Sequence, residues 1–220
     1  MIILAIELST VRASAALLAD SRCMAERSWI EKTGQAQPLF RHVNDLCRET
    51  GVALEAIGLF ACGRGPGAYS GLRIAVTAAQ AWALPGQREV YAVDSGEALA
   101  AAVACGKDIQ HVAVVGDARR DHLWMGLFES TGDGLKLIRP WSVVRPGDLA
   151  GELPSGTLCV TSDWSRLQPT IQKQAASLEW IREDRFPEAR DVGLLAWGKK
   201  HLGRPSEPLT PIYLHPSVAK

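Results

Sequence analysis

The chain has 220 residues, of which 47% are hydrophobic and 22% are charged, as in ordinary globular proteins. Lysine plus arginine and aspartate plus glutamate both number 24, so the formal net charge is zero, which disfavours a protein that grips a nucleic acid unaided. The five cysteines include no C-x-x-C pair, which predicts free thiols in a reducing compartment. No apolar stretch reaches the roughly 20 residues that cross a bilayer, so we expect a cytoplasmic protein.

The first half of the chain predicts the element order βββ-α-β-α-β-α. Three short apolar or alternating runs with tight connections favour an antiparallel meander, and apolar residues at three- and four-residue steps then favour a helix. The predicted strands are Ile2–Leu8, Ala13–Ala19, Arg22–Ile30, Ile57–Cys62 and Glu89–Val93, and the predicted helices are Gln37–Thr50, Leu72–Leu84 and Ser95–Cys105.

The same order then restarts. Placing Glu7 over Asp117 without gaps puts Leu17 over Leu127, so each half offers an apolar strand, an acid, a polar turn and a second apolar strand. The predicted strands are His111–Asp117, His122–Phe128, Leu135–Val144, Thr157–Thr161 and Leu178–Ile181; the predicted helices are Trp164–Ala176 and Ala189–Leu202, with a short helix or turn at Pro146–Leu153. The tail Pro208–Lys220 is expected to be an ordered extension without regular structure.

This internal repeat predicts an α/β protein of two lobes, each with a mixed sheet flanked by helices. We place the first lobe at residues 1–106 and a smaller second lobe at residues 107–220, with the option that the helix over residues 189–203 packs back on the first lobe.

The glycine-rich segment Gly63–Gly71 lies between a predicted buried strand and a predicted helix. Glycines allow close backbone approach, and the N–H groups of a helix start bind anions, so the segment is either an anion site or simply a tight connection. A P-loop is excluded because its lysine is missing. Gly63, Gly65 and Ala68 formally satisfy the dinucleotide-binding pattern, with Asp94 ending the next strand, but the opening meander disfavours that fold.

Three motifs carry a resemblance to a known family. They are I-L-A-I-E-L-S-T at the first strand, G-R-G-P-G-A-Y-S-G-L-R-I-A at the glycine segment and G-D-A-R-R after the strand that opens the second half. In this order, and with the P-I-Y-L tail, they resemble the bacterial TsaB family, formerly called YeaZ, a shortened paralogue of the TsaD/Kae1-type enzyme. The resemblance implies an actin/Hsp70-like (ASKHA) fold and a role in making N6-threonylcarbamoyladenosine at position 37 of transfer RNA.

The resemblance further implies a non-catalytic subunit that binds and activates a TsaD-type transferase. Its implied partners are that transferase, a TsaE-type ATPase, and a second copy of itself when alone, with transfer RNA touched only through the complex. It implies no cofactor of its own, ATP and Mg²⁺ belonging to the partner complex. The residues leave one alternative open, a stand-alone phosphotransferase or ATPase of the same fold that uses Glu7 and Asp117.

No catalytic residue or metal ligand is predicted. The enzymatic paralogue holds a metal with a His-x-x-x-His pair, and none of the five histidines here forms such a pair. His, Cys and carboxylate residues at metal-ligand spacing, and the nucleophile elbow of a serine hydrolase, are likewise missing from the sequence.

Two sets of candidate site residues remain. The candidates for binding a nucleotide or phosphate are Glu7, Ser9, Gly65, Gly67 and Asp117, although Glu7 stands where the wider fold usually has aspartate. The candidates for the partner interface lie on the first-lobe helices, where only outward side chains qualify; they are Leu39, Val43, Leu46, Arg73, Val76 and Gln80.

The second-lobe turn and two tryptophans each allow a structural and a binding role. Asp117, Arg119 and Arg120 are expected either to form a hairpin tip with local ion pairs or to contact a nucleotide, transfer RNA or the partner. Trp124 and Trp141 lie in alternating apolar patterns and are expected to fill the second core rather than to stack on a base.

Overall fold

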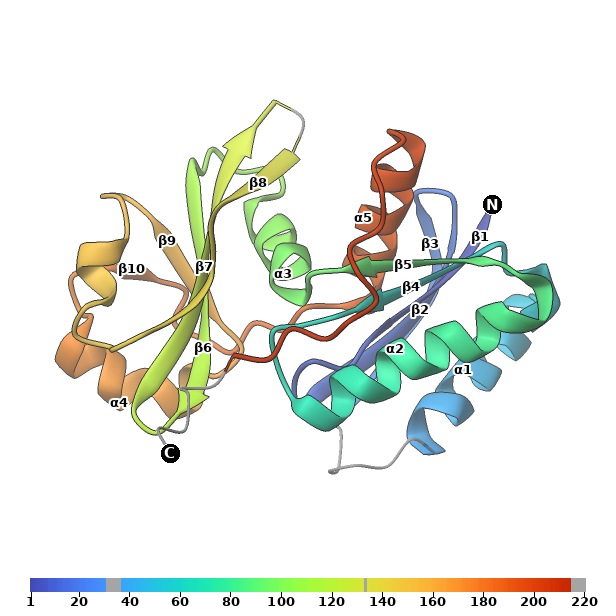
Figure 1. Cartoon of the computed structure of the whole chain (residues 1–220), viewed down its shortest axis with the longest axis horizontal. Helices are drawn as coiled ribbons and strands as arrows, with labels where there is room; N and C mark the ends of the chain where they lie inside the picture. The colour runs from blue at the N-terminus through green and yellow to red at the C-terminus, as the bar shows by residue number, and fades with distance from the viewer. Residues whose placement is uncertain (31–36, 133, 215–220) are drawn as a thin grey trace. The chain divides into compact units, whose positions relative to one another are not determined.

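The computed structural model describes residues 1–30, 37–132 and 134–214. The chain divides into two compact units, which we describe one at a time. The first unit comprises residues 1–98 and 187–212, so the chain leaves it and later returns. Its five-stranded sheet has the order β3-β2-β1-β4-β5 (Figure 1). The strands are β1 (Ile2–Glu7), β2 (Arg12–Ala19), β3 (Arg22–Ile30), β4 (Leu59–Gly63) and β5 (Glu89–Val93).

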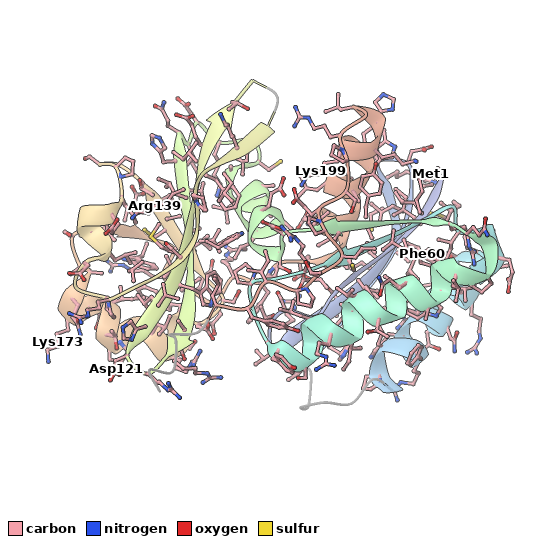
Figure 2. The ribbon with its side chains drawn as sticks, in the orientation of Figure 1. Met1, Phe60, Asp121, Arg139, Lys173 and Lys199 are labelled. Atoms are coloured by element: carbon pink, nitrogen blue, oxygen red, sulfur yellow. The ribbon has the colours of Figure 1, made fainter. Side chains whose placement is uncertain are left out.

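Helices cover both faces of this first sheet. On one face, α1 (Gln37–Thr50) and α2 (Tyr69–Ala83) pack on Leu4, Ile6 and the buried ring of Phe60 (Figures 1 and 2). On the other face, α5 (Ala189–His201) packs on the alternate residues of the same strands, among them Ile3 and Ala5. Because successive side chains of a strand point to opposite faces, a strand covered on both sides is apolar throughout, which explains the unbroken apolar run of β1.

Among the described residues, the second unit comprises residues 99–186 together with Tyr213 and Leu214. Its sheet has the order β10-β9-β6-β7-β8. The strands are β6 (His111–Arg119), β7 (His122–Thr131), β8 (Gly134–Val144), β9 (Leu158–Thr161) and β10 (Glu179–Trp180). One face packs on α4 (Trp164–Gln174), and the other packs on the second half of α3 (Ser95–Ala104), the helix within which the first unit gives way to the second.

The two sheets repeat one topology. In each, a three-stranded antiparallel meander contributes its first strand to the middle of the sheet, and two strands parallel to that one complete the order. The repeat predicted from the sequence is therefore confirmed, as is the predicted fold class of two mixed sheets flanked by helices. This is the architecture that the actin/Hsp70-like resemblance implied. In the second core, the rings of Trp124 and Trp141 pack edge to face, 5.8 Å apart, as the alternating pattern predicted.

Two local predictions need correction. Helix α2 begins at Tyr69, three residues before the predicted start, because Gly71 lies inside the helix and does not precede it. Helix α4 continues through Pro169 and ends at Gln174, two residues before the predicted end. The predicted tail is described only as far as Leu214, so its last six residues lie outside the described part of the chain. No helix in the described ranges is both long and apolar enough to cross a membrane.

Candidate functional site

The glycine-rich segment is filled by the chain's own atoms. Gly63 ends β4, and a β-carbon placed on it would lie 1.8 Å from Oε2 of Glu7 and 2.6 Å from Oγ of Ser95. Only glycine leaves room for the Glu7 carboxyl group at this point. Gly65 has a φ of +102°, a left-handed conformation that favours glycine, and a cis peptide bond joins it to Pro66.

The next glycines lie against the turn between β1 and β2. A β-carbon on Gly67 would be 2.2 Å from the carbonyl oxygen of Ser9, and one on Gly71 would be 1.9 Å from the carbonyl oxygen of Leu8. The N–H of Ala68 donates to that Ser9 oxygen at 2.7 Å. The fold thus brings Glu7, Ser9, Gly65 and Gly67 together in the first unit.

Several backbone donors around this loop are already used. The N–H of Ser9 donates to Oε1 of Glu7 at 2.6 Å, that of Gly65 donates to Oγ of Ser95 at 3.0 Å, and that of Arg64 donates to the Val93 carbonyl at 2.9 Å. An anion cradle needs N–H groups that are free to face the ligand. The hydrogen bonds of the loop therefore hold β1, β4, α2 and the start of α3 together.

The Glu7 side chain is completely buried. Burial raises the pKa of its carboxyl group, and the nearby hydroxyl groups of Ser9 and Ser95 only partly oppose this change. Among the described residues, Oε2 accepts no hydrogen bond of good geometry, although both hydroxyl groups lie close to it. A carboxyl group that is completely buried and enclosed by backbone is poorly suited to coordinate Mg²⁺.

The fifth nucleotide-site candidate, Asp117, belongs to the second unit. Its Oδ1 accepts the N–H of Arg119 at 2.6 Å, and its Oδ2 contacts Nη1 of Arg166 and lies 3.5 Å from Nη1 of Arg119. Arg119, Arg120 and Asp121 all have positive φ, so three consecutive left-handed residues form the turn after β6. Of the two expectations for this turn, the geometry matches a hairpin tip with local ion pairs.

The described residues contain no group of three or more His, Cys, Asp or Glu side chains that could hold a metal ion. The two fully buried cysteines are poor nucleophiles, since burial raises the pKa of Cys62 and Cys159 to about 12.

Comparison with known proteins places the chain in a family. Residues 35–173 match the sequence model of the family described as TsaD, tRNA N6-adenosine threonylcarbamoyltransferase. The tRNA threonylcarbamoyladenosine biosynthesis protein TsaB of Bacillus subtilis is 31% identical over 143 residues, which are 64% of this chain and 60% of that protein. The match thus spans less than two thirds of this relative.

Two solved structures extend the likeness to nearly the whole chain. One is a Pseudomonas aeruginosa protein described as similar to the peptidase YeaZ, with a TM-score of 0.83, 28% identity, and 97% of this chain and 99% of that one covered. The other, YeaZ from Pseudomonas aeruginosa, has a TM-score of 0.79 at the same identity and coverage. The chain belongs to the TsaD family and, within it, to the TsaB (YeaZ) group.

For this TsaB-group chain, four of the residues proposed for the partner interface point inward. Leu39, Val43 and Leu46 of α1 are buried in the first core, and Val76 of α2 is only 6% exposed in the same cluster. Our condition was that interface residues face outward, so these four are withdrawn as candidates. Their three- and four-residue spacing marks the side of each helix that packs on its own sheet.

The outward side of α2 carries a different set of residues. Tyr69, Arg73, Thr77 and Gln80, with Leu84 directly after the last residue of the helix, follow one another at helical spacing and are all exposed. Tyr69 is 53% and Leu84 77% exposed. Arg73 and Gln80 therefore remain candidates. The guanidinium of Arg73 lies 5.3 Å from the centre of the Tyr69 ring, and its Nη1 donates to the Tyr69 hydroxyl at 2.6 Å.

Helix α1 adds one exposed aromatic residue to this surface. Phe40 is 45% exposed and packs edge-on against Trp82 of α2, with ring centres 5.6 Å apart. We call Phe40 and the exposed α2 residues the partner face. Phe40, Tyr69 and Leu84 were missed from the sequence, although Phe40 does interrupt the polar side of α1, which was a usable signal.

Proposed function

We propose that the chain is a non-catalytic subunit that acts in the threonylcarbamoyladenosine modification of transfer RNA by binding and activating a TsaD-type transferase. The observation that carries this proposal is the partner face, an exposed surface of α1 and α2 on which aromatic and apolar side chains stand among polar ones and which the protein's own sheet leaves uncovered. Membership in the TsaB group, and the name of the Bacillus subtilis relative, supply the pathway.

The composition of the partner face suits a protein partner. Aromatic residues and arginine dominate the few positions that hold most of the binding energy in protein interfaces. Phe40 and Tyr69 are held in place by Trp82 and Arg73, so little side-chain entropy remains to be lost on binding. A standard interface covers about 800 Å² on each partner, an area that two adjacent helices can supply.

No observation on the described residues favours the alternative, a stand-alone phosphotransferase or ATPase. Such an enzyme needs accessible carboxylates to hold Mg²⁺ and the phosphates. Glu7 is buried against Gly63, and Asp117 is engaged by Arg119 and Arg166. Both carboxylates on which this alternative depends are committed to contacts within the chain.

The remaining parts of the proposal follow from the family. We place the protein in the cytoplasm, with ATP and Mg²⁺ bound by the partner complex and not by this chain. A TsaE-type ATPase is its further partner, transfer RNA is contacted only through the complex, and the same face pairs two copies when the transferase is missing.

Gel filtration of the chain mixed with the TsaD-type protein of the same organism, with and without ATP, tests the proposal. We expect a stable heterodimer that replaces self-association. Phe40→Glu should weaken it by placing an unpaired charge in a desolvated contact, whereas Leu202→Glu, an equally drastic change at an exposed residue just after α5, should not. Failure of the unmodified chain to form a complex under any nucleotide condition would contradict the proposal.

A further inference from the structure

The segment that follows α5 is fastened to the first unit at two places. We call residues 206–212 the strap; after α5 they pass along β5 (Figure 1). The N–H of Glu207 donates to the Ala92 carbonyl at 3.3 Å, and the N–H of Ala92 donates to Oγ of Ser206 at 2.9 Å. Farther on, the N–H of Ile212 donates to the carbonyl of Arg64 at 2.8 Å. The strap thus pairs with β5 at Ala92 and with the glycine loop at Arg64.

A group of half-buried charges reinforces this fastening. Arg64, whose side chain is 14% exposed, donates from Nε to Asp94 at 2.6 Å and from Nη2 to Glu207 at 3.2 Å. The other carboxylate oxygen of Glu207 lies 3.6 Å from Nζ of Lys199 on α5 (Figure 2), which also binds Glu97 at 2.7 Å. Glu207 therefore joins the loop to α5. The Arg64–Asp94 and Lys199–Glu97 pairs are at most 16% exposed on either side, and Glu207, itself 38% exposed, links these two buried pairs.

The loop lies between the strap and the first turn of α2. A β-carbon on Gly65 would be 2.8 Å from Cδ1 of Leu72 and 3.1 Å from the carbonyl oxygen of Ile212. Leu72 is in the first turn of the helix that carries Tyr69 and Arg73. Displacement of the loop would therefore reach the start of α2 directly.

We propose that the strap positions the partner face, and that Glu207 is the positioning residue, acting through Arg64. The proposal rests on the proposed function for the identity of the partner. It assigns the strap a role in partner binding without contact with the partner.

Hydrogen exchange and binding on the full chain test this proposal. Glu207→Gln keeps the shape and removes the charge. Glu89→Gln is the matched control, since Glu89 lies on β5, the strand that the strap contacts, and pairs with Lys200 at the surface. Exchange of the amides at residues 65–72 should quicken, and affinity for the TsaD-type partner should fall about tenfold, in Glu207→Gln alone. Unchanged exchange at these residues, or faster exchange with unchanged affinity, would overturn the proposal.

A double-mutant cycle separates positioning from general destabilisation. If Glu207 acts through Arg64, adding Glu207→Gln to Arg64→Gln should have little further effect on affinity. If the effects of the two substitutions on affinity add fully, Glu207 acts by another route, which would contradict the proposal. If the unmodified chain binds no TsaD-type partner, the proposed function fails, while the exchange measurement still decides whether the strap holds the loop.

Discussion

Glycines in the Gly63–Gly71 segment matter mainly because they have no side chain. Of the four, only Gly65 has a positive φ. At Gly63, Gly67 and Gly71 an added β-carbon would come within 2.2 Å of Glu7 or of the turn after β1. A segment whose composition suggests a ligand cradle thus serves close packing of backbone on backbone, and the distinction is visible only once the neighbours are known.

Burial of Glu7 gives a testable pH dependence. Because its pKa is raised in the folded state, the folded chain keeps a proton that the unfolded chain has already released. Its favourable contribution is therefore complete below the ordinary glutamate pKa and is lost as the pH rises through the raised value. Glu7→Gln cannot ionise and does not lose this contribution. As the pH rises, we therefore expect the free energy of unfolding of the unmodified chain to fall relative to that of Glu7→Gln.

Urea unfolding of both proteins from about pH 4 to about pH 8 measures this difference. Glu55→Gln, a change at an exposed glutamate of the same unit, controls for the added amide. Parallel stability curves for Glu7→Gln and the unmodified chain would show that the buried carboxyl does not govern the pH dependence.

At the scale of elements, the strongly periodic segments were predicted best. The bounds of β3, β5 and α1 agree with the sequence prediction to the residue, because alternation or helical spacing continues to each end. The start of α2 was wrong because Gly71 is helical for a tertiary reason, its contact with Leu8. The orientation of both helices was available from periodicity, yet the inward residues were chosen as interface candidates because they were apolar.

Val76 provides the test of that corrected orientation. Because it is buried in the first core, Val76→Glu should destabilise the fold by about 3 kcal/mol or more, as expected for an unpaired charge in an apolar site. Gln80→Glu, one turn later on the exposed side, should change stability little. Urea unfolding measures both, and a Val76→Glu variant as stable as the unmodified chain would contradict the placement.

At the scale of the whole molecule, the repeated topology followed from the sequence, whereas the joining of distant segments did not. The matched positions of Glu7 and Asp117 predicted two similar sheets, and the strand orders agree. The Arg64–Glu207 pair joins residues 143 positions apart, and nothing in the local pattern of either segment signals it. Folding likewise brought four of the five nucleotide-site candidates, Glu7, Ser9, Gly65 and Gly67, together in the first unit, and left Asp117 in the second. The burial of Glu7 then set the chemistry of that group.

Two buried thiols report on the two units separately. Cys62 lies in the first sheet and Cys159 in the second, and both are fully buried with a pKa of about 12, so neither should react with iodoacetamide in the native chain, whereas the exposed Cys105 should. With rising urea we expect Cys159 to become reactive first, since the second unit has the smaller core. Mass spectrometry of pulse-labelled protein measures the two midpoints, and a common midpoint would show that the units unfold together.

The division of the first unit between both ends of the chain has a consequence for synthesis. Nearly all of the second unit is one continuous stretch, but the first needs α5, whose Ala189, Val192 and Ala196 complete the core on one face of β1. During translation that face stays uncovered until residues 189–196 have left the ribosome. The first unit, although its strands are made first, is therefore completed only after most of the second unit has been synthesised.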